Sequence, residues 1–322
     1  MQYRKLGRTG IDVSDIGYGA WGIGQKQWLG GTDFEALAGL RRALDLGLNF
    51  IDTALAYGEG HSERLIGQVL SERSHKVYVA SKVPPKNMIW PAKQGFGIDE
   101  VFPVDHIIQS TETSLKNLGV PYLDLQQLHV WNPEWVGRDE LRRAVEDLKK
   151  SGKVHFFGVS INDHQPDSAI PLIETGLVDT VQVIYNIFDQ TAEKNLFPAA
   201  MKHNIGVIAR VPLDEGSLAG TITKDTKFEP GDFRENYFRG DRKLEVQEHV
   251  SALLADLDLE PSDLPQIALR FCFSHPAVST VIPGMRSLRS VEANCSFSRL
   301  GPLPENTLAV LKRHAWDRNY YL

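Results

Sequence analysis

Short apolar runs rich in β-branched residues alternate along the chain with longer stretches whose apolar residues recur at helical spacing. The short runs predict strands at residues 16–20, 49–52, 77–82, 123–129, 155–160, 181–185, 207–211 and 280–283. The longer stretches predict helices at residues 140–150, 165–174 and 193–202. Thr32 and Glu35 have the spacing of a capping box ahead of a leucine-rich helix, and Asp105 is expected to cap a helix that stops at Gly119.

Strands that alternate with helices pair in parallel through right-handed crossovers. About eight such units in 322 residues match a closed (β/α)8 TIM barrel, and no composition break divides the chain. We therefore expect one domain over residues 1–322, with an open, doubly wound sheet as the alternative. Two long segments, residues 83–104 and about 212–240, follow predicted strands at the end where barrels carry their sites. They are expected to be binding loops, and surface insertions are the alternative.

Composition narrows the classes of function. Hydrophobic residues make up 42% and charged residues 24%, as in ordinary folded proteins, and a net charge of −6 offers no basic excess for nucleic acid. The only cysteines, Cys272 and Cys295, argue against a disulfide scaffold and favour a reducing, cytoplasmic setting. We read no signal peptide, and no run approaches the roughly 20 apolar residues of a membrane span.

Residues 17–22 read Gly-Tyr-Gly-Ala-Trp-Gly, which matches the G-x-G-x-x-G pattern of dinucleotide-binding loops. That fingerprint needs a helix to open at the third glycine, and the Gly-rich residues 23–31 do not start one cleanly. We favour a tight strand end beside a ligand.

Polar residues close three consecutive predicted strands: Asp52, Lys82 and His129. A buried charge needs a partner, so Asp52 and Lys82 are expected to pair. Two of them have plainer alternatives: a turn or helix cap for Asp52 and a satisfied structural histidine for His129. Tyr57, on the adjoining loop, adds a phenol whose usual pKa near 10 is lowered by a neighbouring cation. Together the four predict a site where Tyr57 exchanges a proton with a carbonyl oxygen that His129 orients.

Several motifs carry a family resemblance: Asp52-Thr53-Ala54-x-x-Tyr57-Gly58, Ser62-Glu63-x-x-Ile66-Gly67, Lys82, Asp124-Leu125-x-x-x-His129, Gly158-Val159-Ser160 and Ile282-Pro283-Gly284. Together they resemble the aldo-keto reductase family over nearly the whole chain, and residues 3–10 are similar to its bacterial and potassium-channel-β-like branches. The resemblance implies a (β/α)8 barrel with an N-terminal β-hairpin. It also implies a catalytic tetrad of Asp52, Tyr57, Lys82 and His129, and a nicotinamide cofactor extended across the barrel top.

The resemblance also suggests residues that bind this cofactor: Trp21, Ser160, Asn162, Gln182, Arg210, Pro212, Leu213, Ser217, Leu218, Gly284, Arg286, Arg289, Ser290 and Asn294. Two positions depart from the family pattern. Ile161 stands where Asn usually follows the serine, with Asn162 one residue later, and Arg210 replaces an aromatic that stacks on nicotinamide. Arg286 and Arg289 favour NADP(H) over NAD(H), with two solvated arginines as the alternative.

Arg210 needs a plane to stack on or an anion to pair with. We expect Arg210 to lie over the nicotinamide with its guanidinium edge toward the pocket, where it would favour carbonyl substrates that carry a carboxylate or phosphate. The alternative is that Asp214 or Glu215, which follow shortly, supply the anion. Candidates for an apolar pocket wall are Trp21, Trp90, Trp131 and Phe188, each of which has a core position as its alternative.

We therefore expect an NADP-dependent aldo-keto reductase that reduces an aldehyde or ketone, with a small-molecule substrate and no metal, nucleic acid or membrane as partner. One rival is a Schiff-base aldolase-like barrel with Lys82 as the nucleophile. The other is a catalytically weak nicotinamide-binding regulatory or sensor subunit, as in the channel-associated branch.

Overall fold

The computed structural model describes residues 1–322 and contains one sheet of eight parallel strands in chain order. Bridges from Ile16 to Val281 and from Gly19 to Gly284 join its two edge strands and close it into a barrel. The barrel strands are β3 (Tyr18–Gly19), β4 (Phe50–Asp52), β5 (Tyr78–Val83), β6 (Leu123–Leu128), β7 (Val154–Ser160), β8 (Thr180–Ile184), β9 (Gly206–Arg210) and β10 (Val278–Val281).

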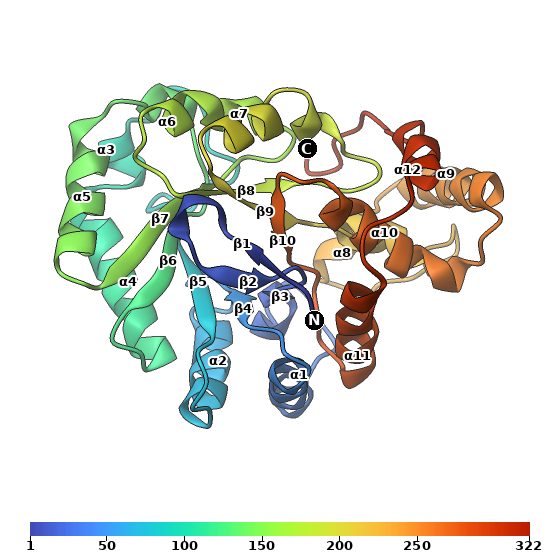
Figure 1. Ribbon diagram of the computed structural model, residues 1–322, viewed down its shortest axis with the longest axis horizontal. Helices are drawn as coiled ribbons and strands as arrows, with labels where there is room; N and C mark the ends of the chain where they lie inside the picture. The colour runs from blue at the N-terminus through green and yellow to red at the C-terminus, as the bar shows by residue number, and fades with distance from the viewer.

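Helices form an outer ring around these strands (Figure 1). They are α1 (Asp33–Asp45), α2 (His61–Ser71), α3 (Ile98–Val101), α4 (Val104–Leu118), α5 (Asp139–Lys150), α6 (Ile170–Glu174), α7 (Leu196–Lys202), α8 (Phe233–Tyr237), α9 (Arg242–Leu257), α10 (Leu264–Ser274), α11 (Leu288–Phe297) and α12 (Glu305–Lys312). The architecture is the expected (β/α)8 barrel, and none of the helices is long and apolar enough to cross a bilayer.

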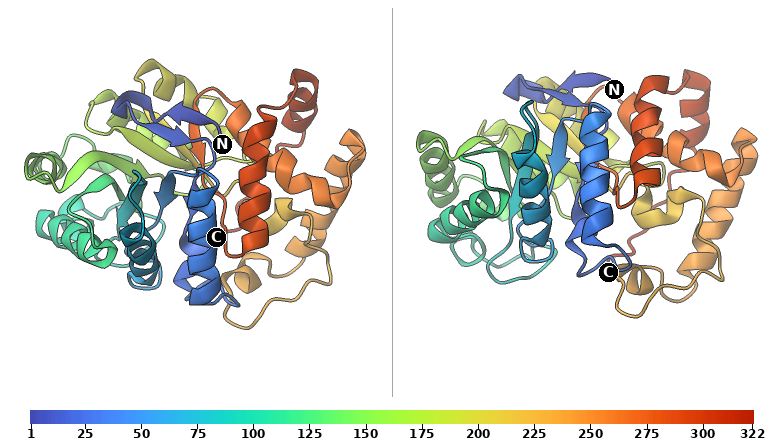
Figure 2. Two further views of the ribbon diagram at one scale, coloured as in Figure 1. Left: turned by 60° about the horizontal axis from the view of Figure 1, so that its bottom comes forward. Right: turned by 90° about the horizontal axis from the view of Figure 1, so that it is seen from below.

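An antiparallel hairpin of β1 (Tyr3–Lys5) and β2 (Asp12–Ser14) crosses one end of the barrel (Figure 1). Leu6 and Val13 from the hairpin region belong to the buried cluster that fills this end. Figure 2 places the N-terminus at the hairpin end and the C-terminus at the opposite end. The hairpin therefore seals one end of the barrel, and any site must open at the other.

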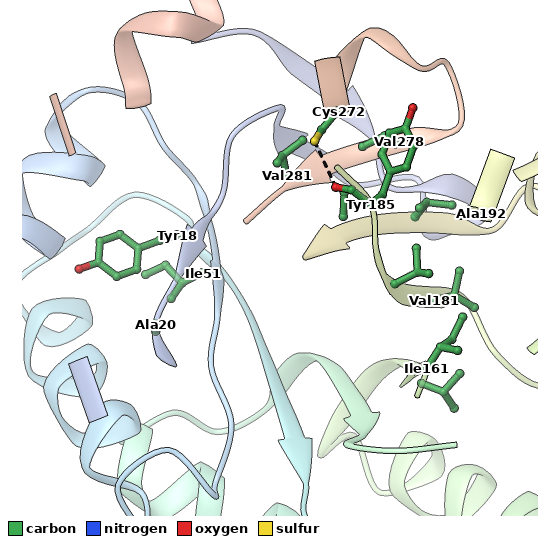
Figure 3. Packing of buried hydrophobic residues seen from close by; sticks show 14 of the residues in the cluster. Tyr18, Ala20, Ile51, Ile161, Val181, Tyr185, Ala192, Cys272, Val278 and Val281 are labelled. Atoms are coloured by element: carbon green, nitrogen blue, oxygen red, sulfur yellow. Dashed lines mark hydrogen bonds between the residues drawn. The ribbon is translucent and has the colours of Figure 1, made fainter. Parts of the chain in front are cut away.

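The larger hydrophobic cluster gathers residues from both the strands and the surrounding helices (Figure 3). On one side of it, the thiol of Cys272 on α10 donates a hydrogen bond of 3.2 Å to the backbone oxygen of Tyr185 at the end of β8. Both Cys272 and Cys295 are buried and unpaired.

The predicted strands are all present, and most of their ends move by one or two residues. The first is the shortest of them, Tyr18–Gly19. The capping box is confirmed: the Thr32 hydroxyl accepts from the Glu35 amide at 3.2 Å, and the Glu35 carboxylate accepts from the Thr32 amide at 3.2 Å. The cap at Asp105 is wrong. The helix begins at Val104 after Pro103, so Asp105 lies in its first turn, where a carboxylate still favours the positive end of the helix.

Candidate active site

Side chains two residues apart on a strand point to the same face of the sheet. Inside the barrel, four apolar residues of the hairpin end are followed two positions later by polar ones: Phe50 by Asp52, Ala80 by Lys82, Leu125 by Gln127 and Ile208 by Arg210. The interior therefore changes from an apolar layer to a polar layer toward the carboxyl ends of the strands.

The expected pair of Asp52 and Lys82 lies in this polar layer. Lys82 Nζ is 2.6 Å from Asp52 Oδ2, donates to the Thr53 backbone oxygen at 2.8 Å, and lies 3.3 Å from the Tyr57 hydroxyl. The Lys82 side chain is 0% exposed and that of Asp52 is 3% exposed. A buried ammonium with three oxygen partners is thereby fixed beside the phenol.

The second oxygen of Asp52 also has partners. Gln182 Nε2 donates to Asp52 Oδ1 at 2.7 Å, and Gln127 Nε2 lies 3.4 Å from the same atom. Gln127 is buried and was not predicted as a site residue. Its signal in the sequence is the two-residue step from Leu125 within β6, which places its side chain inside the barrel.

His129 follows the end of β6 and joins the group. Its ring centroid lies 5.6 Å from that of Tyr57 and 5.9 Å from that of Trp90, both edge-on, and its buried Nδ1 has no hydrogen-bond partner. The structure thus brings Asp52, Tyr57, Lys82 and His129 together.

Burial governs the electrostatics of this group. It raises the pKa of Tyr57 above 10, although Lys82 acts in the opposite direction, so the expected net lowering is wrong. Burial together with the Lys82 and Arg210 cations holds the pKa of His129 well below 6.5. Burial also lowers the pKa of Lys82, but Asp52 and Tyr57 outweigh it and raise that pKa overall. At neutral pH the site therefore holds a protonated phenol, a neutral imidazole and an ammonium.

A cavity of about 770 Å³ opens over these residues at the carboxyl ends of the strands. Its lining includes Tyr57 and His129, together with ten of the predicted cofactor residues: Trp21, Ser160, Asn162, Gln182, Arg210, Pro212, Leu213, Gly284, Arg286 and Ser290. The other four do not line it: Ser217, Leu218, Arg289 and Asn294. The cavity extends from the phenol of Tyr57 to the guanidinium of Arg286.

Residues 15–315 match the model of the aldo/keto reductase family. The chain belongs to this family.

Three relatives illustrate its range. Aldo-keto reductase YhdN of Bacillus subtilis (strain 168) is 32% identical over 302 residues, which cover 91% of this chain and 87% of that protein. The NADH-specific methylglyoxal reductase of Escherichia coli (strain K12) is 28% identical, over 90% and 91% of the two chains. A probable voltage-gated potassium channel subunit beta of Arabidopsis thaliana is 29% identical, over 94% and 93%. Both branches expected from the sequence are represented.

A solved structure supports the same assignment. The holo form of aldo-keto reductase AKR11C1 from Bacillus halodurans superposes with a TM-score of 0.76 at 26% identity, covering 98% of this chain and 96% of that one. The barrel and its hairpin are thus those of an aldo/keto reductase.

Within this aldo/keto reductase, Arg286 and Arg289 differ in their surroundings. Arg286 Nη1 donates to the Leu29 backbone oxygen at 2.7 Å, and its guanidinium carbon lies 5.4 Å from the ring centroid of Trp28. Arg289 is exposed on α11, outside the cavity. Of these two arginines, Arg286 is the one that lines the cavity.

Arg210 has an acidic partner other than Asp214 and Glu215, the two residues considered as the alternative. Its Nη2 donates to Asp163 Oδ1 at 2.6 Å and to the Ile161 backbone oxygen at 3.0 Å. The alternative that Asp214 or Glu215 pairs with it is wrong, because Asp214 binds Arg318 and Glu215 accepts from Tyr321. Asp163, Glu215 and Tyr321 all line the cavity and were not predicted.

The four candidate aromatics separate into two groups. Trp21 and Trp90 line the cavity. Trp131 and Phe188 do not; they are buried in the larger hydrophobic cluster, and the Trp131 indole donates to the Ser168 backbone oxygen at 3.0 Å. Although both follow strand ends, Trp131 and Phe188 pack in the core and are not part of the pocket wall.

The glycine motif at residues 17–22 starts no α-helix, since a 3₁₀ turn over Trp21–Gly24 follows it. A Cβ on Gly19 would lie 2.6 Å from the backbone oxygen of Ile282. Glycine is therefore needed there for the close approach of two strand ends, and Gly19 and Gly22 also line the cavity.

Proposed function

We propose that the protein is an NADP(H)-dependent carbonyl reductase in which Tyr57 is the general acid. The observation that carries this proposal is the row of buried Asp52, buried Lys82 and half-buried Tyr57, which ends at a cavity that extends to Arg286. A long ligand whose reactive end meets Tyr57 and whose anionic end meets Arg286 fits that shape.

The residues present suit a nicotinamide nucleotide. A Cβ on Gly284 would meet no atom within 4 Å, so the wall is open there, and Ser160, Gln182 and Ser290 add polar groups along the cavity. Gln182 and Ser160 would hold the carboxamide end, and Arg286 with Ser290 the adenosine end. Such a nucleotide supplies a hydride to the carbonyl carbon of the substrate.

The chain's own residues handle the proton. Negative charge grows on the substrate oxygen as the carbonyl is reduced, and the Tyr57 hydroxyl donates its proton to that oxygen. Lys82 stabilises the phenolate that remains, and Asp52 keeps Lys82 protonated and in place. A neutral His129 donates a hydrogen bond to the same oxygen and orients it without competing as an acid.

The Arg286 side chain supports a preference for NADP(H), because a guanidinium binds a phosphate more strongly than a hydroxyl. The name of the Escherichia coli relative states the opposite preference for that protein. For this chain the preference therefore rests on Arg286 alone.

We propose small, uncharged aldehydes or ketones as substrates. Asp163 already neutralises Arg210, so the expectation of anionic substrates loses its main support. Trp21, Trp90 and Met88 provide an apolar wall near the tetrad. If Arg210 instead recruits anionic substrates, Arg210→Tyr will shift the ratio of kcat/KM for an anionic and a neutral aldehyde of similar size.

The Schiff-base rival fits the structure poorly. A nucleophilic lysine must be unprotonated and reachable, whereas Lys82 is fully buried, carries a raised pKa and is bound by three oxygens. The regulatory rival keeps the same nucleotide site and differs only in turnover.

The test is NADPH oxidation over a panel of aldehydes and ketones, for the wild type and Tyr57→Phe. The variant keeps the ring, so NADPH binding is expected to hold while kcat falls by roughly 10²–10⁴. Full kcat in the variant, with chemistry rate-limiting, would remove Tyr57 from the mechanism. Tight NADPH binding by the wild type with no turnover on any carbonyl would favour the regulatory rival.

A further inference from the structure

The segment that follows β9 carries unusual backbone strain. Val211, Asp214 and Glu215 adopt φ values of 56°, 50° and 54°, in the left-handed region. This region is costly for any residue with a Cβ and most of all for a β-branched one such as Val211. Strained conformations persist only where the surroundings hold them. The segment, residues 211–216, also forms part of the cavity wall.

The contacts that hold two of these residues come from the last residues of the chain. Arg318 forms an ion pair with Asp214, in which each side chain is 7% exposed. The Tyr321 hydroxyl donates to Glu215 Oε1 at 2.6 Å. Both contacts join positions more than 100 residues apart in sequence.

The C-terminal residues are themselves anchored elsewhere. Arg242 Nη1, on α9, donates to the Tyr320 backbone oxygen at 2.7 Å, and Arg239 donates to the Leu322 backbone oxygen at 2.5 Å. The Trp316 amide donates to the Phe188 backbone oxygen at 2.9 Å. Figure 2 shows the C-terminus at the end of the barrel opposite the hairpin. The tail is thus a fixed support rather than a loose end.

We propose that Arg318 and Tyr321 act as a latch that holds the strained segment 211–216 in the conformation that lines the cavity, both as positioning residues. The latch does not depend on whether the protein catalyses the proposed carbonyl reduction. Its consequence for ligand binding rests on the proposed function, because segment 211–216 then forms part of the nucleotide and substrate site.

The experiment measures hydrogen exchange of the ligand-free protein in Arg318→Met and Tyr321→Phe. Three amides report on the segment because each donates to one of its backbone oxygens: Asp214 to the Val211 oxygen, and Gly216 and Leu218 to the Leu213 oxygen. We expect exchange at these amides to rise roughly tenfold in Arg318→Met and several-fold in Tyr321→Phe, with little change in the barrel strands.

Two variants of the same tail serve as controls. Arg313→Met removes an exposed arginine that pairs with Asp256, and Tyr320→Phe removes a hydroxyl that bonds Glu245. Neither side chain contacts segment 211–216 through these bonds, so both controls should leave its exchange unchanged. Equal effects of Tyr320→Phe and Tyr321→Phe would overturn the proposal.

A second substitution distinguishes a latch on this segment from a general contribution of Arg318 to the stability of the protein. Glycine adopts positive φ without strain, so Asp214→Gly in the Arg318→Met background should restore protection at Gly216 and Leu218. Faster exchange throughout the protein, or no change in the segment, would contradict the latch.

A second readout is the dissociation constant for NADPH, which is expected to rise in Arg318→Met and to recover in the double variant. A wild type that binds no NADPH would defeat the proposed function, and the exchange data would still decide the latch.

Discussion

Asp52 organises the site because its two oxygens have different partners. Oδ2 meets the ammonium of Lys82, while Oδ1 accepts from Gln182 and lies near Gln127. Donors on both oxygens stabilise the carboxylate form of a buried acid, and the carboxylate in turn keeps Lys82 charged. A lysine held this way can act on Tyr57 only from one fixed position, 3.3 Å away.

Lys82→Met should therefore change the pH dependence of the reaction as well as its rate. Lys82 lowers the pKa of Tyr57 against the larger effect of burial, so its removal raises that pKa further. The basic limb of the kcat profile for reduction should then move to higher pH, and kcat should fall by about 10²-fold or more. The measurement is kcat against pH with a slow substrate.

The control for this prediction is the double variant Lys82→Met with Asp52→Asn. The single variant leaves Asp52 buried without a cation, which costs stability, and the double variant removes both charges. In both variants the basic limb of the kcat profile should lie at higher pH than in the wild type, because both lack Lys82. A basic limb that stays at the wild-type position in both would show that Lys82 does not tune Tyr57.

Arg286 and Arg289 provide a matched pair for cofactor preference. Arg286 lines the cavity and Arg289 is exposed outside it. A charge-assisted bond to phosphate contributes about 1.5–3 kcal/mol, so Arg286→Ala should weaken NADPH binding by roughly tenfold to a hundredfold and NADH binding far less. Arg289→Ala should change neither. The measurement is the dissociation constant of each variant for NADPH and for NADH. If Arg286→Ala weakened the binding of both nucleotides equally, Arg286 would not recognise the 2′-phosphate.

At the scale of the elements, the strands and the tetrad were predictable for one physical reason. The carboxyl ends of parallel strands meet at one rim of a barrel, so polar residues at the ends of consecutive strands, such as Asp52 and Lys82, are brought together. Helix α9 was missed because only Val246, Val250 and Leu253 are buried along its 16 residues, which leaves a weak apolar face. The contacts of Arg318 and Tyr321 depend on packing between distant segments and have no local signal.

The seam of the barrel, where β3 meets β10, leaves no room for a side chain at Gly19. Gly19 lies where β3 and β10 close the sheet, and a Cβ there would sit 2.6 Å from the Ile282 oxygen and 2.9 Å from the Pro283 oxygen. Because backbone atoms cannot move aside easily, Gly19→Ala should lower the free energy of unfolding by roughly 1–3 kcal/mol. Gly31→Ala is the control, since a Cβ on Gly31 meets nothing within 4 Å. Urea unfolding measures both, and equal stabilities would show that the seam tolerates the methyl group.

At the scale of the whole molecule, the two ends of the chain have complementary places. The N-terminal hairpin fills one end of the barrel with Leu6 and Val13, and Tyr321, next to the C-terminus, lines the cavity at the other. The Tyr321 hydroxyl donates to the buried carboxyl group of Glu215. That carboxyl group makes the stability of the whole chain depend on pH.

Burial raises the pKa of Glu215 from 4.5 to about 7. Asp214 and Asp163 act in the same direction, while the Tyr321 hydroxyl and Arg210 oppose it. The folded state therefore binds this proton more tightly than the unfolded state does. Its stabilising effect is complete well below pH 4.5 and is lost as the pH rises through about 7, by at most about 3.5 kcal/mol at roughly 1.4 kcal/mol per pKa unit.

Glu215→Gln should remove this loss, because glutamine still accepts from Tyr321 and does not ionise. We expect the free energy of unfolding of the variant, relative to the wild type, to increase by up to about 3 kcal/mol between pH 4.5 and pH 8. Comparing the two proteins cancels the titration of every other group that Glu215 does not touch. Urea unfolding at several pH values measures the difference, and parallel stability curves would show that Glu215 is ionised at the same pH in the folded and unfolded chains.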